Sequence, residues 1–238
     1  MAQQFPTLYT DKTGSIKTTI FNLFNEKGTE CLEMVLDGIS FIASSFDSFA
    51  LVNPKSYSDD RLSRYTFNKI PIAGTDDYRM ELCNCRLDFH IPQFIVDTEN
   101  DVVIGADLKI RLQLGKPSKK GGIVGLNAQF TLSFDGRQLL SESTDFETAY
   151  SQIQKDMLPG FRFSNCFSCH YSDYSPAGSG FFASMMCFRE NKAAYLTASE
   201  KKEFFKLAMD GFIAVQETHR CDEFAPREKG TGYRGWPF

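Results

Sequence analysis

Apolar and polar residues alternate along the first 143 residues with the period of two that is typical of β-strands. In residues 106–114, ADLKIRLQL, every second residue is apolar, and residues 126–134, LNAQFTLSF, repeat the pattern. Residues 81–91 alternate as well, with Cys83 and Cys85 on the apolar face. One-sided strands of this kind, separated by turns, predict antiparallel sheets packed as a sandwich or an open barrel.

Two Asp-Gly pairs predict hairpins within this region. Asp37-Gly38 lies between two apolar runs, and Asp135-Gly136 directly follows LNAQFTLSF. Because Asp-Gly tolerates the positive φ of a type I′ turn, each pair predicts a two-residue connection between strands. The first hairpin would place Leu36 opposite Ile39, with the other apolar residues of both strands on the same face.

From residue 144 onward the apolar period becomes that of a helix. Thr144-Asp-Phe-Glu147 has the spacing of a capping box, and apolar residues at helical spacing follow it as far as Pro159-Gly160. Thr197-Ala-Ser-Glu200 is a second such box, and the helix behind it is expected to stop at Gly211.

These patterns predict an α+β fold in two parts. Residues 1–143 are expected to form an antiparallel β-sandwich-like body. Residues 144–238 are expected to form a smaller helix and loop module, packed directly on the body because no Ser/Gly-rich linker separates them. The absence of helical patterns before residue 144 argues against a parallel sheet, which needs helices between its strands.

Composition and charge narrow the class of protein. Of the 238 residues, 42% are hydrophobic and 24% are charged, which fits a globular protein with a sizeable core. The net charge of −4 argues against nucleic acid and anionic membranes as partners, because such binding needs a positive field. With no secretory signal and no membrane-length apolar run, we expect a cytoplasmic protein whose seven cysteines are thiols or metal ligands.

The stretch CFSCHYSDYSP carries the main candidate for chemistry. Cys166 and Cys169 form a C-x2-C pair, and Cys187 and Cys221 follow as isolated cysteines. A C-x2-C turn supplies two of the four soft ligands that a tetrahedral zinc ion needs. The stretch is also rich in aromatic residues and turns, and metal coordination commonly replaces core burial in such segments. We therefore predict that these four cysteines hold a structural zinc ion.

Other interpretations of the cysteines stay open. Cys166-Phe-Ser-Cys169-His170 matches the attachment pattern of covalent haem, although such attachment belongs mostly to exported proteins. A redox dithiol would place its first thiol at the start of a helix, whereas HYSDYSP is turn-prone. The cysteines would otherwise be unconnected thiols, since free cysteine is often buried. Within the zinc interpretation, His170 or His219 would replace one cysteine in a Zn(Cys)3His site.

The remaining motifs favour structural roles. Cys83 and Cys85 are expected to pack in the core of the body. DTEND, residues 97–101, lacks the glycine and the terminal glutamate of an EF-hand loop, so a solvated turn is expected. GKPSKKGG, residues 115–122, lacks the lysine-plus-hydroxyl pair of a phosphate loop and is expected at a hairpin tip. No catalytic signature such as G-x-S-x-G or H-E-x-x-H is present, so no catalytic residue is predicted.

The run CFSCHYSDYSPAGSG…MMCFRENK, together with the ending GTGYRG, resembles a pattern of uncharacterised bacterial proteins of similar length. The resemblance covers residues 163–235 and does not extend to the β-rich part. It implies a bacterial source and implies that the four C-terminal cysteines act as one unit. It implies no activity.

The leading functional hypothesis is a cytosolic binding protein that presents a surface to a protein partner. A toxin-neutralising immunity protein is one instance, because a compact acidic fold can cover a basic active site. The alternative is a metal-dependent enzyme of the hydrolase type, with an open zinc site and Asp173 or Glu217 as the base. Single-strand RNA binding is less favoured because residues 161–190 carry balanced charges and no basic groove.

Overall fold

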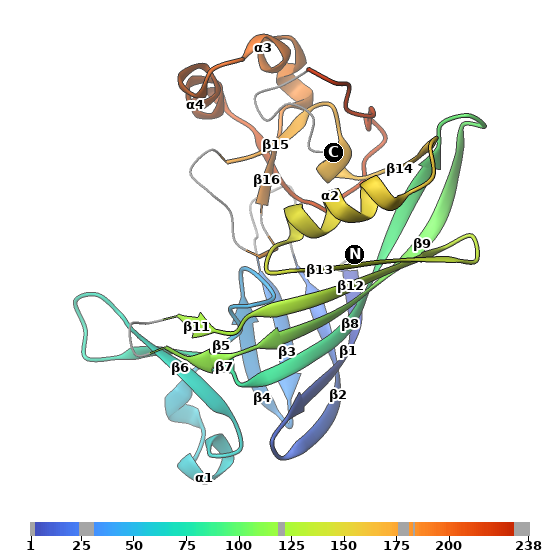
Figure 1. The fold of residues 1–238 in the computed structure, drawn as a ribbon. Helices are drawn as coiled ribbons and strands as arrows, with labels where there is room; N and C mark the ends of the chain where they lie inside the picture. Colours follow the sequence, from blue (N-terminus) through green and yellow to red (C-terminus); the bar gives the residue numbers. More distant parts are fainter. Residues whose placement is uncertain (1–2, 24–30, 119–121, 176–180, 183, 231–238) are drawn as a thin grey trace.

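The computed structural model describes residues 3–23, 31–118, 122–175, 181–182 and 184–230. Most of these residues form one antiparallel sheet of twelve strands that curls on itself (Figure 1). Eleven strands lie side by side in the order β13 (Arg137–Ser143), β12 (Asn127–Phe134), β9 (Val102–Leu114), β8 (Cys85–Asp97), β1 (Gln3–Asp11), β2 (Gly14–Asn22), β3 (Leu32–Leu36), β4 (Ile39–Ala43), β5 (Ala50–Leu51), β7 (Tyr78–Cys83) and β6 (Thr66–Pro71). The twelfth, β14 (Phe161–Phe163), pairs with the far end of β8.

Two smaller sheets and several helices complete the described fold. β10 (Lys116–Pro117) pairs with β11 (Ile123–Val124), and a three-stranded sheet contains β15 (Ser172–Tyr174), β16 (Ser184–Cys187) and β17 (Ile213–Gln216). The α-helices are α1 (Asp59–Leu62), α2 (Phe146–Asp156), α3 (Lys192–Thr197) and α4 (Lys201–Asp210). Short 3-10 turns lie at η1 (Pro54–Ser56), η2 (Cys166–Ser168) and η3 (Arg189–Asn191). α3 and α4 lie at the end of the molecule away from the large sheet (Figure 1).

Both predicted hairpins are confirmed. Asp37 and Gly38 have φ angles of 47° and 74°, the positive values that a type I′ turn requires. Leu36 pairs with Ile39, and the alternate residues of β3 and β4 that share their face are buried. The Asp135-Gly136 pair has φ angles of 48° and 69° and joins β12 to β13 in the same way.

The β-rich antiparallel body is also confirmed, but its strands form one continuous path instead of the two separate sheets of a sandwich. β8 and β9 are each 13 residues long, and right-handed twist accumulates along such strands. The curl brings the buried side chains of β8, β9 and β12 against the buried side chains of β1 to β4. One sheet thereby buries its own concave face.

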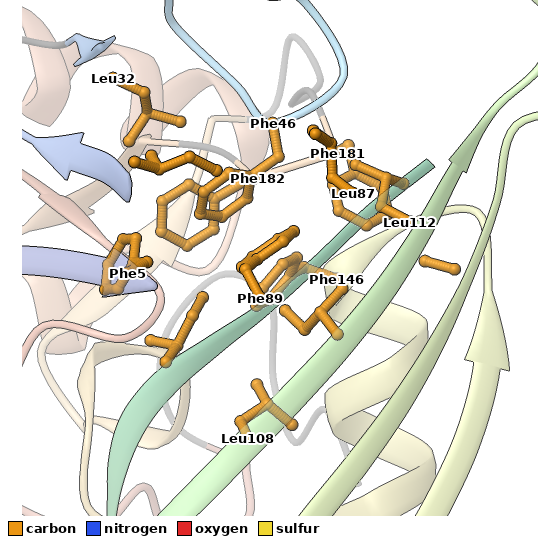
Figure 2. Close-up of a cluster of buried hydrophobic side chains, with 14 of the residues drawn as sticks. Phe5, Leu32, Phe46, Leu87, Phe89, Leu108, Leu112, Phe146, Phe181 and Phe182 are labelled. Carbon is orange, nitrogen blue, oxygen red and sulfur yellow. The ribbon is translucent and has the colours of Figure 1, made fainter. Parts of the chain in front are cut away.

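Residues on both sides of position 143 share the main hydrophobic core. The ring of Phe46, between β4 and β5, lies 4.4 Å from that of Phe89 on β8 and 4.5 Å from that of Phe182. The ring of Phe182 lies in turn 5.0 Å from that of Phe146 on α2. Figure 2 shows these rings gathered in one cluster. The segment after residue 143 therefore completes the core of the large sheet.

Buried amide groups also attach the C-terminal segments to the large sheet. Asn22 of β2 donates to Oε1 of Gln216 on β17 at 2.7 Å, and Gln216 donates back to Oδ1 of Asn22 at 3.2 Å. On β8, Oε1 of Gln93 accepts hydrogen bonds from the hydroxyl of Tyr150 at 2.9 Å and from the amide of Asn165 at 3.0 Å. Such buried hydrogen bonds are expected to fix how the C-terminal segments lie on the large sheet, because a buried amide in any other position would lose its partners.

The two predicted capping boxes were misplaced. α2 is capped by Asp145 and not by Thr144, because the Asp145 carboxylate accepts a hydrogen bond from the backbone N–H three residues ahead at 2.7 Å. α4 is capped by Glu200, whose box partner is Glu203. Thr197 instead ends α3, a helix that the apolar pattern did not predict; α1, a single turn before residue 144, was missed as well.

Residues 81–91 form two strands where one was predicted. Asn84 has a φ of 52°, and its N–H donates to the carbonyl of Gly115 at 2.6 Å. The left-handed residue redirects the chain, so that β7 pairs with β5 and β6 whereas β8 pairs with β1 and β9. Cys83 and Cys85, on either side of the break, are both buried, as predicted.

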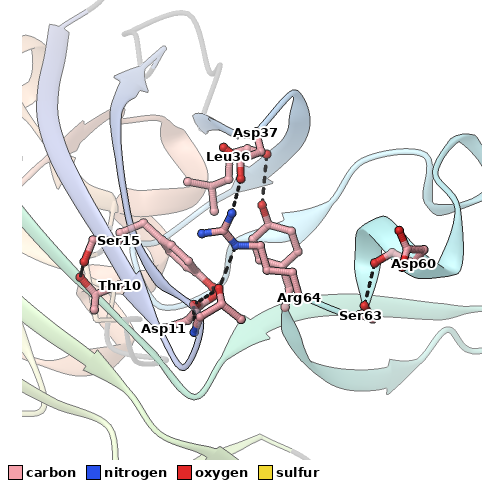
Figure 3. Close-up of polar contacts among 11 residues, drawn as sticks. Thr10, Asp11, Ser15, Leu36, Asp37, Asp60, Ser63 and Arg64 are labelled. Carbon is pink, nitrogen blue, oxygen red and sulfur yellow. Dashed lines mark hydrogen bonds and ion pairs between the residues drawn. The ribbon is translucent and has the colours of Figure 1, made fainter.

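A polar network lies where the β1–β2 hairpin meets the segment after α1 (Figure 3). The Asp11 carboxylate accepts hydrogen bonds from the Tyr9 hydroxyl at 3.0 Å and from the backbone N–H of Thr13 at 2.7 Å. Nε of Arg64 lies 3.9 Å from the same carboxylate, and Arg64 also pairs with Asp37. Burial by itself would raise the pKa of Asp11, but the hydrogen bonds outweigh burial and lower it.

The Asp11→Ala variant is expected to lower the free energy of unfolding by about 1–3 kcal/mol near neutral pH, because Tyr9 and Thr13 lose their acceptor. Since the folded-state pKa is lowered, the contribution of Asp11 is present above the pKa of the unfolded chain and is lost as pH falls through the folded value. Urea unfolding of wild type and variant should therefore give a difference that narrows below about pH 4. An equal difference at neutral and acid pH would contradict this assignment.

Candidate metal centre

The C-x2-C pair folds as one tight turn. Cys166 to Ser168 form η2, and the N–H of Cys169 donates to the carbonyl of Cys166 at 3.2 Å. β14 leads into this turn and β15 leaves it, so the turn is held between two paired strands. No α-helix begins there, which disfavours the redox-dithiol interpretation.

Cys187 and Cys221 reach the turn from two other segments. Cys187 ends β16, where it pairs with Ser172 on one side and Ile213 on the other. The segment after β17 runs beside the turn, because the N–H of Cys166 donates to the carbonyl of His219 at 2.7 Å. Cys221 lies on this segment, two residues further along the chain.

The four cysteines are close enough to influence one another electrostatically. Negative charge on Cys169, Cys187 or Cys221 raises the pKa of Cys166. Negative charge on Cys221 also raises the pKa values of Cys169 and Cys187. Among the described residues, however, no group of three or more His, Cys, Asp or Glu side chains is arranged to hold a metal ion. The fold thus places the four cysteines near one another, but their sulfur atoms are not arranged as the ligands of one metal ion.

Two of the sulfurs accept hydrogen bonds from the backbone. The thiol of Cys169 accepts from the N–H of Tyr171 and that of Ala225, and the thiol of Cys187 accepts from the N–H of Arg189. In both turns a donor lies two residues after the cysteine. Hydrogen bonds of this kind stabilise the thiolate, which is the form that binds metals.

Burial dominates the protonation of these thiols. It raises the pKa of Cys166 well above the ordinary range, raises that of Cys169, and raises that of Cys187 to about 11. Without a compensating cation, the three buried thiols are therefore neutral at pH 7. The positive charges of Arg189 and Arg227 act in the opposite direction, lowering the pKa of Cys187 and Cys169 respectively.

The two histidines considered as substitute ligands lie beside the same turn. The N–H of His170 donates to the carbonyl of Ala225 at 2.7 Å, and its ring packs against Tyr171 at 4.9 Å. Burial lowers the pKa of His170, which keeps the imidazole neutral at pH 7. The carbonyl of His219 holds the backbone of Cys166, as described above.

Asp173 and Glu217, the candidate bases of an open metal site, are each 1% exposed. The Asp173 carboxylate accepts from the Tyr195 hydroxyl at 3.1 Å and lies 4.0 Å from Arg227. Glu217 accepts from the Tyr174 hydroxyl at 3.1 Å. Both carboxylates are thus inaccessible to a substrate in solution.

Sequence reasoning missed Arg227, whose side chain is fully buried. It donates to the carbonyl of Ser172 and to the hydroxyl of Tyr195, and its N–H donates to the carbonyl of Ser168 at 2.9 Å. These contacts tie the end of the described chain to the cysteine turn. The surrounding sequence, FAPREKG, is polar and gives no signal of burial.

The other motifs occupy the structural places expected of them. DTEND forms the turn between β8 and β9, where the Asp97 carboxylate accepts from the backbone N–H of Glu99 at 3.0 Å and that of Asn100 at 3.2 Å. GKPSKKGG contains β10 and ends just before β11, with which β10 pairs; residues 119–121 of this motif lie outside the described residues. Parts of the resemblance motif, at 176–180 and 231–235, lie outside them too.

A family model matches residues 3–172, which is most of the chain. The chain belongs to DUF6304, a family of unknown function. The match includes Cys166 and Cys169 but ends before Cys187 and Cys221, so it does not test the resemblance noted over residues 163–235. No curated protein and no solved structure matches the chain. In the described part of the chain, no helix is long and apolar enough to cross a membrane.

Proposed function

We propose that this DUF6304 member is a binding protein whose C-terminal part is held in shape by a structural zinc ion on Cys166, Cys169, Cys187 and Cys221. The observation that carries the proposal is that the segments holding Cys187 and Cys221 lie against the Cys166–Cys169 turn: Cys187 pairs with Ser172, and the N–H of Cys166 donates to the carbonyl of His219 at 2.7 Å. Because no described side chains already form a metal-holding group, binding requires the sulfurs to close around the ion.

The chemistry of the donors favours zinc. Four thiolates in a tetrahedron suit zinc or an iron–sulfur cluster, and zinc is the usual occupant of a closed structural site. Four thiolates and one divalent zinc leave a net charge of about −2, and a nearby cation such as Arg189 offsets part of it. A reducing compartment keeps the cysteines from forming disulfides and leaves them free to bind the ion, so we also propose a cytoplasmic location.

A structural ion would add to the packing of the C-terminal part, whose turn residues Cys166 and Phe167 already belong to the main core. Away from the main core, the only cluster of buried apolar residues found among the described residues has five members: Phe188, Tyr195, Ala198, Phe204 and Leu207. This cluster is small, and a metal ion on the nearby cysteines would stabilise the outer end of the chain further. The buried state of Asp173 and Glu217 gives no support to an open, catalytic site.

Metal analysis tests the zinc ion. Protein purified without added zinc is expected to contain about one zinc ion per chain, with no visible absorption from iron–sulfur or haem. A content on the order of a tenth of an equivalent or lower would overturn the zinc proposal. Iron in place of zinc would overturn the choice of metal.

Partner capture tests the binding role. A tagged form of the full chain, expressed in its native host, is expected to retain a stoichiometric protein partner that mass spectrometry identifies. A basic toxin among the retained proteins would support the immunity-protein interpretation. The absence of any stoichiometric partner would contradict the binding role while leaving the zinc proposal intact.

A further inference from the structure

The side of α4 that faces away from the protein carries two exposed apolar side chains. Phe204 and Leu207 pack inward and are 0% and 5% exposed. Phe205 and Met209, four residues apart on the other side, are 39% and 88% exposed. Residues at this spacing lie next to each other along a helix, so the two side chains form one protruding apolar ridge.

Lysines surround this ridge. Lys201 and Lys202 lie four and three residues before Phe205, and Lys206 lies three residues before Met209, so all three border the ridge. Nζ of Lys201 lies 5.6 Å from the centre of the Phe205 ring. All three lysines are exposed.

The acidic residues of α4 are turned elsewhere. The Glu203 carboxylate accepts hydrogen bonds from the N–H of Ser199 at 3.0 Å and that of Glu200 at 3.3 Å. Glu200 is itself the N-cap, with its side chain engaged by the backbone. Asp210, at the other end, lines a hollow next to Phe212 and Glu190. The three lysines thus lie on the same side of α4 as Phe205 and Met209, whereas the acidic side chains are engaged by the backbone or lie at the end of the helix.

We propose that this α4 outer face, made of Lys201, Lys202, Phe205, Lys206 and Met209, binds the surface of an anionic lipid bilayer. Apolar side chains between lysines on one helix face suit a boundary where acyl chains lie below phosphate headgroups. Met209 protrudes and is 88% exposed, which suits a soft bilayer that deforms around it better than a folded partner. α4 also lies at the outer end of the molecule, where a flat surface can reach it (Figure 1).

The net charge of −4 does not prevent this binding. At physiological salt, charges separated by more than about 8–10 Å are largely screened, so a bilayer at this face senses its lysines more than the acidic residues on other elements. Glu200, Glu203 and Asp210 lie on the same helix and offset part of the attraction. The expectation of no membrane partner was based on the net charge of the whole chain. That sum does not show that the fold places three lysines together on one side of α4.

Vesicle flotation with the full-length protein tests the proposal. We expect binding to vesicles of phosphatidylglycerol and phosphatidylcholine in equal parts, weakening steeply as salt is raised from low to about 0.5 M, and none to pure phosphatidylcholine. The combined substitution Lys201→Gln, Lys202→Gln and Lys206→Gln should weaken binding about a hundredfold. The pair Phe205→Ser and Met209→Ser should weaken it about tenfold.

Matched controls distinguish loss of the α4 outer face from a general effect of lower positive charge or smaller exposed apolar surface. Lys12→Gln, Lys17→Gln and Lys155→Gln change the net charge equally at exposed sites elsewhere, and Leu140→Ser removes a residue that is 68% exposed on β13. These controls should bind as wild type does, and all variants should keep the wild-type melting temperature.

Three results would overturn the proposal: no binding to anionic vesicles, equal binding to neutral vesicles, or equal loss in the controls. If the α4 variants instead lose a protein partner in the capture experiment and vesicles stay unbound, the face is a protein interface. That outcome would overturn the lipid proposal and support the binding role.

Discussion

The Cys166→Ser variant is expected to lose its stoichiometric zinc and, with it, the order of the chain around the cysteine turn. The Cys166 side chain is 2% exposed and lies within electrostatic reach of the other three cysteines. Serine cannot replace the thiolate as a soft ligand, and structural zinc sites contribute about 10–16 kcal/mol of apparent binding free energy in small domains. We therefore expect limited proteolysis to cut the variant after residue 164 under conditions that leave wild type intact.

Cys85→Ser is the matched control, because Cys85 is also 2% exposed but belongs to the core of the large sheet. It should keep about one zinc ion per chain even if the sheet becomes less stable. A strong chelator should reproduce the Cys166→Ser protease pattern in wild type and leave the pattern of the Cys166→Ser variant unchanged. Equal zinc contents in the Cys166→Ser and Cys85→Ser variants would show that Cys166 is not a ligand.

The Phe46→Ala variant is expected to lose about 3–5 kcal/mol of unfolding free energy, the usual cost of removing a fully buried phenylalanine. Its ring contacts Phe89 of the large sheet and Phe182 of the later segment, so its removal leaves a cavity where the two parts of the chain meet. For a chain of this length the loss corresponds to a fall of about 10 °C in melting temperature. Differential scanning calorimetry measures both quantities.

Phe21→Ala serves as the control for Phe46→Ala. Phe21 lies on β2 and is 38% exposed, so the same truncation should cost about 1 kcal/mol or less. Calorimetry should also give a single transition for the Phe46→Ala variant if the sheet and the later segment unfold together. A small loss at Phe46, or two separate transitions in wild type, would contradict the shared core.

Local signals in the sequence predicted local structure well. Asp37-Gly38 determined a turn type because its backbone conformation depends mainly on the two residues themselves. The alternation in residues 106–114 predicted which side chains of β9 are buried, because a one-residue slip would expose them all. The start of α2 was misjudged by one residue because Thr144 and Asp145 are both residue types that commonly cap helices.

The turn that carries the C-x2-C pair was predictable from the sequence, whereas a shared metal site of the four cysteines stays a prediction. The C-x2-C spacing identified the tight turn, and the chemistry of sulfur suggested the ligand set. Nothing in the sequence marked Arg227 as buried, because its partners are the distant Ser172 and Tyr195. Nor did the apolar pattern separate inward Phe204 from outward Phe205.

The sequence by itself determined the antiparallel strands, the two Asp-Gly hairpins and the end of α4 at Gly211. These features depend on the period of apolar residues and on the backbone preferences of a few neighbouring residues. Only the tertiary structure decided that the strands curl into one sheet, that the segment after residue 143 completes its core, and that α4 turns lysines and apolar side chains outward together. Each of these results from contacts between residues far apart in the chain, whose energies no local pattern records.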